Sequence, residues 1–116
     1  MMYKLSKGGI LRKNKNFQTV YKLGKSYANR LLVLYVKPNR EGLRRAGFVT
    51  GKRLGGAVVR NRARRLMKEA YRLNQHQLTT GVDMVFIARQ PIVKADFAAV
   101  SKALLELCGK AQLFNK

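Results

Sequence analysis

The segment AVVRNRARRLMKEAYR at residues 57–72 constrains the fold most strongly, because it is basic and amphipathic at once. On a helical wheel with about 100° per residue, its apolar side chains fall on one stripe, which continues to the residue after the segment, Leu73. The residues of this stripe are Val59, Ala63, Leu66, Met67, Ala70 and Leu73. The pattern predicts a helix that docks on a core through the stripe, with Gly56 as its N-cap.

The far side of this predicted helix carries positive charge. Arg60, Arg64, Lys68 and Arg72 form a row at spacing i, i+4, with Arg65 beside it and Arg62 at the margin of the apolar stripe. Like charges at this spacing oppose helix formation by about 0.2–0.5 kcal/mol per pair, and Glu69 is the sole acid nearby. A solvated basic face is one interpretation, and neutralisation by an external polyanion is the other.

The charge of the whole chain favours the polyanion. Lys and Arg number 25 against five acids, for a formal net charge of +20, and such self-repulsion works against a compact state. Nucleic acid is the obvious candidate for this polyanion. Residues 1–72 hold 20 of the bases and two of the acids, so we expect the side of the protein that faces nucleic acid to be built from them. An anionic membrane is an alternative partner, but the longest apolar run, LLVLYV, is too short to span a bilayer.

Length and composition suit a single nucleic-acid-binding domain over residues 1–116, with residues 1–13 as a flexible basic arm. The N-terminal stretch lacks the apolar region of a signal peptide, and Cys108 is the only cysteine. We therefore expect a cytoplasmic protein in a reducing compartment, with Cys108 at least half buried in a helix.

Periodicity and turn residues predict the remaining elements. They are a helix over 14–23 ended by Gly24, a strand over 30–38, an antiparallel return strand over 46–50, a third strand over 81–89, and a helix over 97–111 capped by Asp96. This order predicts an α+β fold with a small mixed sheet packed with helices, and it leaves one face of the sheet without a helix.

Phe17, Val20 and Tyr21 share one face of the helix over 14–23, at spacing i, i+3, i+4. An aromatic stripe of this kind is usually part of a core, and for a generic domain that interpretation is favoured.

The chain is a poor catalyst by itself. It holds one histidine, His76, and its five acids are scattered, without HxxE, DxD or CxxC spacing. The glycine-bearing GKRLGG does not match a phosphate-binding GxxxxGK[ST] loop. We therefore expect neither catalytic residues nor a metal site in the protein.

Residues 51–72, GKRLGGAVVRNRARRLMKEAYR, resemble the signature segment of the bacterial ribonuclease P protein subunit, including Arg60-Asn61-Arg62. The resemblance extends through residues 13–36 and 82–91. It implies a protein that binds a large catalytic RNA and helps it remove the 5′ leader of precursor tRNA. It also implies that Mg²⁺ ions, bound mainly by the RNA, carry the chemistry, and that no protein partner is obligatory.

The resemblance further implies a fold similar to the second domain of ribosomal protein S5, with about four strands and a left-handed βαβ crossover. The fourth strand is then expected near Ser26 to Asn29. The residues implied to bind the catalytic RNA are Lys52, Arg53, Arg60, Asn61, Arg62, Arg64, Arg65 and Lys68. Those implied to bind the single-stranded leader are Phe17, Tyr21 and Tyr35.

Three other classes share parts of this pattern. A ribosomal protein or RNA chaperone has a similar composition but does not assist leader removal. A DNA-binding protein that uses the helix over 57–72 lacks the preceding helix of a helix-turn-helix motif, since a glycine-rich segment stands there. A stand-alone nuclease is disfavoured by the scattered acids.

Overall fold

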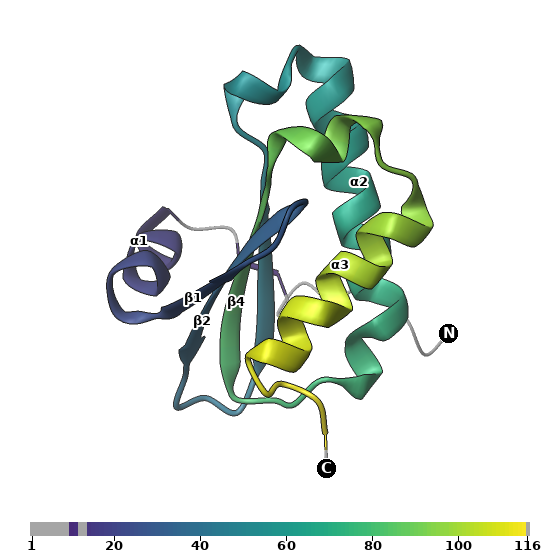
Figure 1. Cartoon of the computed structure of the whole chain (residues 1–116). Coiled ribbons are helices and arrows are strands. Elements are labelled where there is room, and N and C mark those ends of the chain that lie inside the picture. Colours follow the sequence, from purple (N-terminus) through teal and green to yellow (C-terminus); the bar gives the residue numbers. More distant parts are fainter. Residues whose placement is uncertain (1–9, 12–13, 116) are drawn as a thin grey trace.

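The structure is a computed structural model that describes residues 10–11 and 14–115. Its helices are α1 (Asn14–Leu23), α2 (Ala57–Asn74) and α3 (Phe97–Lys110), and its strands are β1 (Lys25–Ala28), β2 (Leu32–Pro38), β3 (Arg44–Val49) and β4 (Val82–Ala88). Short 3-10 turns are η2 (Lys52–Leu54), η3 (Gln75–Gln77) and η4 (Gln90–Lys94). The predicted α+β class is confirmed, with α1 on one side of the sheet and α2 and α3 on the other (Figure 1).

The four strands form one mixed sheet in the order β1-β2-β4-β3. Strand β2 is antiparallel to both β1 and β4, whereas β3 is parallel to β4. The short strand expected near Ser26 is present as β1. The predicted hairpin between β2 and β3 is wrong, because β4 lies between them. All but one residue of β4 is buried, which suits a central strand rather than an edge strand.

Strand β3, helix α2 and strand β4 form the βαβ unit to which the expected left-handed crossover applies. Parallel strands need a long connection, and α2 supplies it. Gly56 begins the helix in an extended conformation, as predicted. The basic helix is therefore held by parallel strands at both ends.

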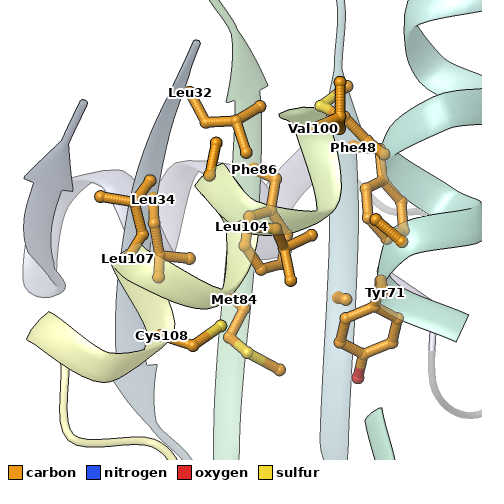
Figure 2. Packing of buried hydrophobic residues seen from close by; sticks show 14 of the residues in the cluster. Leu32, Leu34, Phe48, Tyr71, Met84, Phe86, Val100, Leu104, Leu107 and Cys108 are labelled. Carbon is orange, nitrogen blue, oxygen red and sulfur yellow. The ribbon is translucent and has the colours of Figure 1, made fainter. Parts of the chain in front are cut away.

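The main core lies between the sheet and the pair α2 and α3. Figure 2 shows Leu34, Met84 and Phe86 of the sheet packed beneath Leu104 and Leu107 of α3. The ring of Phe48 stacks on Phe86 at 5.8 Å and meets Tyr71 of α2 edge-on at 5.7 Å. Cys108 is buried in the same layer, and the Asp96 side chain caps α3 by accepting from the Ala99 N–H. Each fully buried side chain of this size stabilises the fold by about 1.5–3 kcal/mol.

We had expected the opposite face of the sheet to be free of helices. This prediction is wrong, because α1 packs against β2 and β4 there. Val20 of α1 is only 1% exposed and packs in a second, smaller core with Val85 and Leu11. Since successive residues of β4 point to opposite faces and nearly all are apolar, both faces need a cover.

Residues 1–9, 12 and 13 of the predicted arm lie outside the described residues. Ile10 and Leu11 belong to the fold instead, since Ile10 forms a parallel bridge with Ala46 on the outer edge of β3. The Leu11 N–H donates to the Ala46 carbonyl at 2.9 Å, and its side chain is buried.

Candidate nucleic-acid interface

The first candidate surface consists of the rings of Phe17, Tyr21 and Tyr35, which we call the aromatic surface. Tyr21 meets Tyr35 edge-on at a centroid distance of 5.1 Å, and Phe17 lies 6.4 Å from Tyr21. All three side chains are half buried. They therefore complete the smaller core and still present ring surface to solvent.

Local structure explains why these rings are not fully buried. Tyr35 alternates along β2 with Leu34 and Val36, whose side chains fill the main core on the other face. On α1 the deepest position belongs to Val20. The aromatic residues thus flank the contact between helix and sheet.

Sequence reasoning missed Gly47, which lies on β3 directly under the Phe17 ring. Gly47 pairs with Val85 of β4, and Val85 pairs in turn with Tyr35 of β2. Gly47, Val85 and Tyr35 therefore lie in one row across the sheet. A glycine inside a strand is the signal that could have indicated this close approach.

A cavity of about 390 Å³ continues the aromatic surface toward the carboxyl ends of β3 and β4. Its lining includes Val49 and Ile87, which pack against the same smaller core of Leu11, Val20 and Val85 as the three rings do. Its rim includes Lys52 and Arg53 of η2, both exposed. We call it the η2 cavity. Apolar, aromatic and cationic groups are therefore adjacent on this face.

Tyr21 remains neutral on this surface. Burial, and to a lesser extent the neighbouring Tyr35, raise the pKa of the Tyr21 phenol above its usual value. A neutral ring adds no negative charge where a phosphate backbone would pass.

The second candidate surface is α2. Its buried residues are Ala63, Met67, Ala70 and Tyr71. The predicted apolar stripe lacked Tyr71 and included Leu66 and Leu73, which are only half buried. The stripe is therefore rotated toward Arg60 relative to our prediction.

This rotation corrects the expected position of the basic row. Arg60 is half buried rather than on the far side, and its Nε atom is buried without a hydrogen-bond partner in the described structure. Arg64 is also half buried, and it donates to Thr50 Oγ1 at 2.7 Å and to Asn61 Oδ1 at 3.1 Å. Arg72 pairs with Glu69, with Nε 3.0 Å from Oε2.

Arg62 points toward the junction between η4 and α3. Its guanidinium donates to the Ala95 carbonyl at 2.8 Å and to the Val93 carbonyl at 3.4 Å. Arg62 therefore holds the chain that precedes α3 against α2, a structural contact that the sequence did not indicate.

The remaining predicted RNA-binding cations are available to a partner. Within the described part of the chain, no hydrogen bond or ion pair is made by the side chains of Lys52, Arg53, Arg65 and Lys68. Asn61 and Arg65 lie exposed on the outer side of α2. The structure thus divides the predicted set into free cations and arginines that also hold the fold.

The five carboxylates do not form a metal centre. No three His, Cys, Asp or Glu side chains are gathered among the described residues. Asp83, 5% exposed, pairs with Arg45 through Nε at 2.7 Å, and Arg45 also binds Glu41. The other three acids bind Arg72, the α3 backbone, and Asn29 with Lys110. This donor set does not fit a magnesium site.

The fold and these surfaces define a small, strongly basic α+β protein with aromatic and cationic groups on one face and a basic helix on the other. No helix in the described ranges is long and apolar enough to cross a membrane. The model of the family Ribonuclease P matches residues 5–112. The chain therefore belongs to the ribonuclease P protein family, and it is a component of a ribonucleoprotein endoribonuclease that functions in tRNA processing.

Individual relatives agree with the family model. The chain is 51% identical to the ribonuclease P protein component of Clostridium perfringens, over 89% of this chain and 88% of the relative. It is 47% identical to that of Clostridium botulinum, over 90% and 96%. The solved RNase P protein of Staphylococcus aureus superposes with a TM-score of 0.86 at 34% identity, covering 94% of this chain and 100% of that one. The resemblance seen in the sequence and the expected fold are both confirmed.

Proposed function

We propose that the protein binds the catalytic RNA of ribonuclease P and the single-stranded 5′ leader of precursor tRNA, and thereby promotes leader removal in the cytoplasm. One observation carries the leader assignment. The aromatic surface and the η2 cavity with its cations lie on the same face of the sheet, because Val49 and Ile87 of the cavity pack against the same smaller core as the three rings. An unpaired strand along this face meets rings for its bases and cations for its phosphates.

The two kinds of contact have separate roles. Unpaired bases stack on aromatic side chains with about 1–3 kcal/mol per base and little sequence preference. Tyr21 and Tyr35 supply such rings. Lys52 and Arg53, for which the resemblance implied contacts with the catalytic RNA, are reassigned in this proposal to the leader phosphates because they line the η2 cavity. The surface therefore suits leaders of differing sequence.

The catalytic RNA is assigned to the outer side of α2, where Asn61, Arg65 and Lys68 lie. Arginine forks suit phosphates and base edges better than lysine does. Because the carboxylates do not fit a magnesium site, we assign Mg²⁺ to the RNA and a binding role to the protein. RNA and this protein alone are proposed to be sufficient for leader removal.

The decisive experiment compares precursor and mature tRNA affinity in holoenzyme assembled with Tyr21→Ala or Tyr35→Ala. Each lost stack should weaken precursor binding by about 1–3 kcal/mol and leave mature tRNA nearly unaffected. Tyr27→Ala is the matched control, because Tyr27 packs against the main core on the opposite face of the sheet.

A precursor-to-mature ratio unchanged in both stably folded variants would remove the leader from the aromatic surface. Phe17→Ala is informative only with a thermal melt, because loss of a packed phenylalanine costs up to about 3–5 kcal/mol of folding stability.

A further inference from the structure

A second and larger cavity lies on the other side of the molecule from the aromatic surface. It measures about 640 Å³ and is open to solvent between the β1–β2 turn, the η4–α3 junction and the first half of α3. Figure 1 shows α3 crossing in front of the strands at this place. We call it the α3 cavity, and neither the leader nor the α2 contacts of the proposed function use it.

The hollow shape of the α3 cavity has a definite origin. Ala95, Ala99 and Ala103 present only methyl groups to it. Its floor is fixed by Asn29, whose Nδ2 donates to the Ala103 carbonyl at 3.0 Å and whose Oδ1 accepts from the backbone N–H of Leu32 at 3.0 Å. The cavity is therefore a held shape rather than a gap between loose segments.

The charges around the cavity favour an anion. Arg30, Lys94 and Lys102 line it and are exposed, and their side chains have no hydrogen bond or ion pair within the structure as described. The two acids in the lining are already engaged. Asp96 caps α3 at 2.9 Å from the Ala99 nitrogen, and Glu106 accepts from Asn29 and pairs with Lys110.

The cavity is joined to the basic helix. Arg62 of α2 donates to the carbonyl of Ala95, which itself lines the cavity. Helices α2 and α3 also pack directly against each other. The α3 cavity therefore has a fixed position relative to α2, within a molecule only 36 Å along its longest axis.

The lining also indicates which part of a nucleic acid would bind. Among the residues that the structure describes, it contains no aromatic ring on which a base could stack. Three separated cations around an open rim instead suit a row of backbone phosphates. A free nucleotide would need a more enclosed site with contacts to its base.

We propose that the α3 cavity is a second docking site for the catalytic RNA, which it contacts through the phosphates of a strand separate from the one on α2. This inference rests on the proposed function and extends it to a new surface. Arg30, Lys94 and Lys102 bind the phosphates, and Arg62 sets the spacing between the two contact sites.

The first test replaces the three cations together, as Arg30→Gln/Lys94→Gln/Lys102→Gln, and measures affinity for the catalytic RNA without tRNA. The dissociation constant should rise roughly tenfold or more, and the log–log salt slope should become shallower by about 2, because three phosphate contacts are lost. The matched control is Lys22→Gln/Lys25→Gln/Arg40→Gln, which removes the same charge from exposed positions outside the cavity.

The second test locates the strand. Cys108 is the only cysteine and is buried, so a cysteine introduced as Ala99→Cys can be labelled selectively with an iron chelate that generates hydroxyl radicals. The radicals should cleave one segment of the catalytic RNA in the complex. The same probe on Asn61→Cys should cleave a different segment.

The outcomes separate the two proposals. If the cavity variant binds like its control while Arg65→Gln still weakens binding, the α3 cavity is not a docking site and the proposed function stands. If affinity falls but the probe at position 99 cleaves nothing, the effect is long-range charge and the docking site is again rejected. If neither variant changes affinity, the assignment of the catalytic RNA to α2 fails as well.

Discussion

The ring of Phe17 occupies the space that a side chain on Gly47 would need. A Cβ built on Gly47 would lie 2.5 Å from Cε1 and 2.6 Å from Cζ of this ring. Contacts between non-bonded carbons are favourable only at about 3.5–4.0 Å. The position of α1 on the sheet, and with it the aromatic surface, therefore depends on the absence of a methyl group.

Gly47→Ala should displace Phe17 and destabilise the protein by about 1–3 kcal/mol through overpacking. Denaturant unfolding measures this loss, and precursor tRNA discrimination should fall with it. Gly51→Ala is the control, since no atom lies within 4 Å of the corresponding Cβ. Equal stability of the two variants would contradict the close contact. Adding Phe17→Leu to Gly47→Ala should recover part of the lost stability.

Arg62 and Arg65 should behave differently although both belong to the basic segment. Arg62→Ala removes two hydrogen bonds to backbone carbonyls and should lower unfolding free energy by about 1 kcal/mol or more. Arg65→Ala should leave stability within about 0.5 kcal/mol and weaken catalytic RNA binding. Thermal melts and RNA titrations on both variants test this division, which fails if Arg65→Ala is the less stable protein.

The thiol of Cys108 should be unreactive in the folded protein. Burial raises its pKa to about 12. An unfolded thiol has a pKa of about 8.5. At a pH of about 8.5, the fraction of Cys108 present as thiolate is therefore roughly three orders of magnitude lower in the folded protein than in the unfolded chain. Labelling by a thiol reagent should therefore follow unfolding, and rapid labelling under native conditions would show that α3 opens locally.

The raised pKa of Cys108 also makes folding stability depend on pH. Because the folded pKa is raised, the stability that Cys108 contributes is fully present below the unfolded pKa of about 8.5 and is lost as pH rises from there toward about 12. Replacement of Cys108 by alanine should remove this dependence between pH 8.5 and 10. Unfolding midpoints measured over that range for parent and variant provide the comparison.

Catalytic RNA affinity should fall steeply with salt. Each neutralised phosphate contributes about −0.7 to −0.9 to the log–log slope, and the free cations of α2 and of the α3 cavity supply several contacts. Binding measured from low to physiological salt yields this slope. A value near zero would leave the net charge of +20 without a role in docking.

Much of the fold could be predicted because local signals are strong where one face is buried. The bounds of α2 and α3 agree with the sequence to within about two residues, and Asp96 is a cap in both. The pairing of β3 was not predictable in this way. An apolar strand after a turn fits either neighbour, and the choice depends on where the remote strand β4 inserts.

The candidate site shows the same limit. A helical wheel can place Arg60 relative to the buried stripe of α2 only when the members of that stripe are known. Because Tyr71 belongs to the stripe, its centre lies nearer to Arg60 than the sequence indicated. The contact of Arg62 with Ala95 joins residues 33 apart, which no periodicity reports. Exposure of Tyr35 followed from strand alternation once β2 was placed, so that part of the aromatic surface could be predicted.

Strand β4 separates the two sides of the molecule by a single layer. Val85 faces the α1 side, and its neighbour Phe86 packs under α3 and α2. In the proposed complex the leader and the catalytic RNA would lie on opposite sides of this one strand. The protein would then act as a spacer of constant thickness, which sets how far the substrate strand lies from the RNA that cuts it.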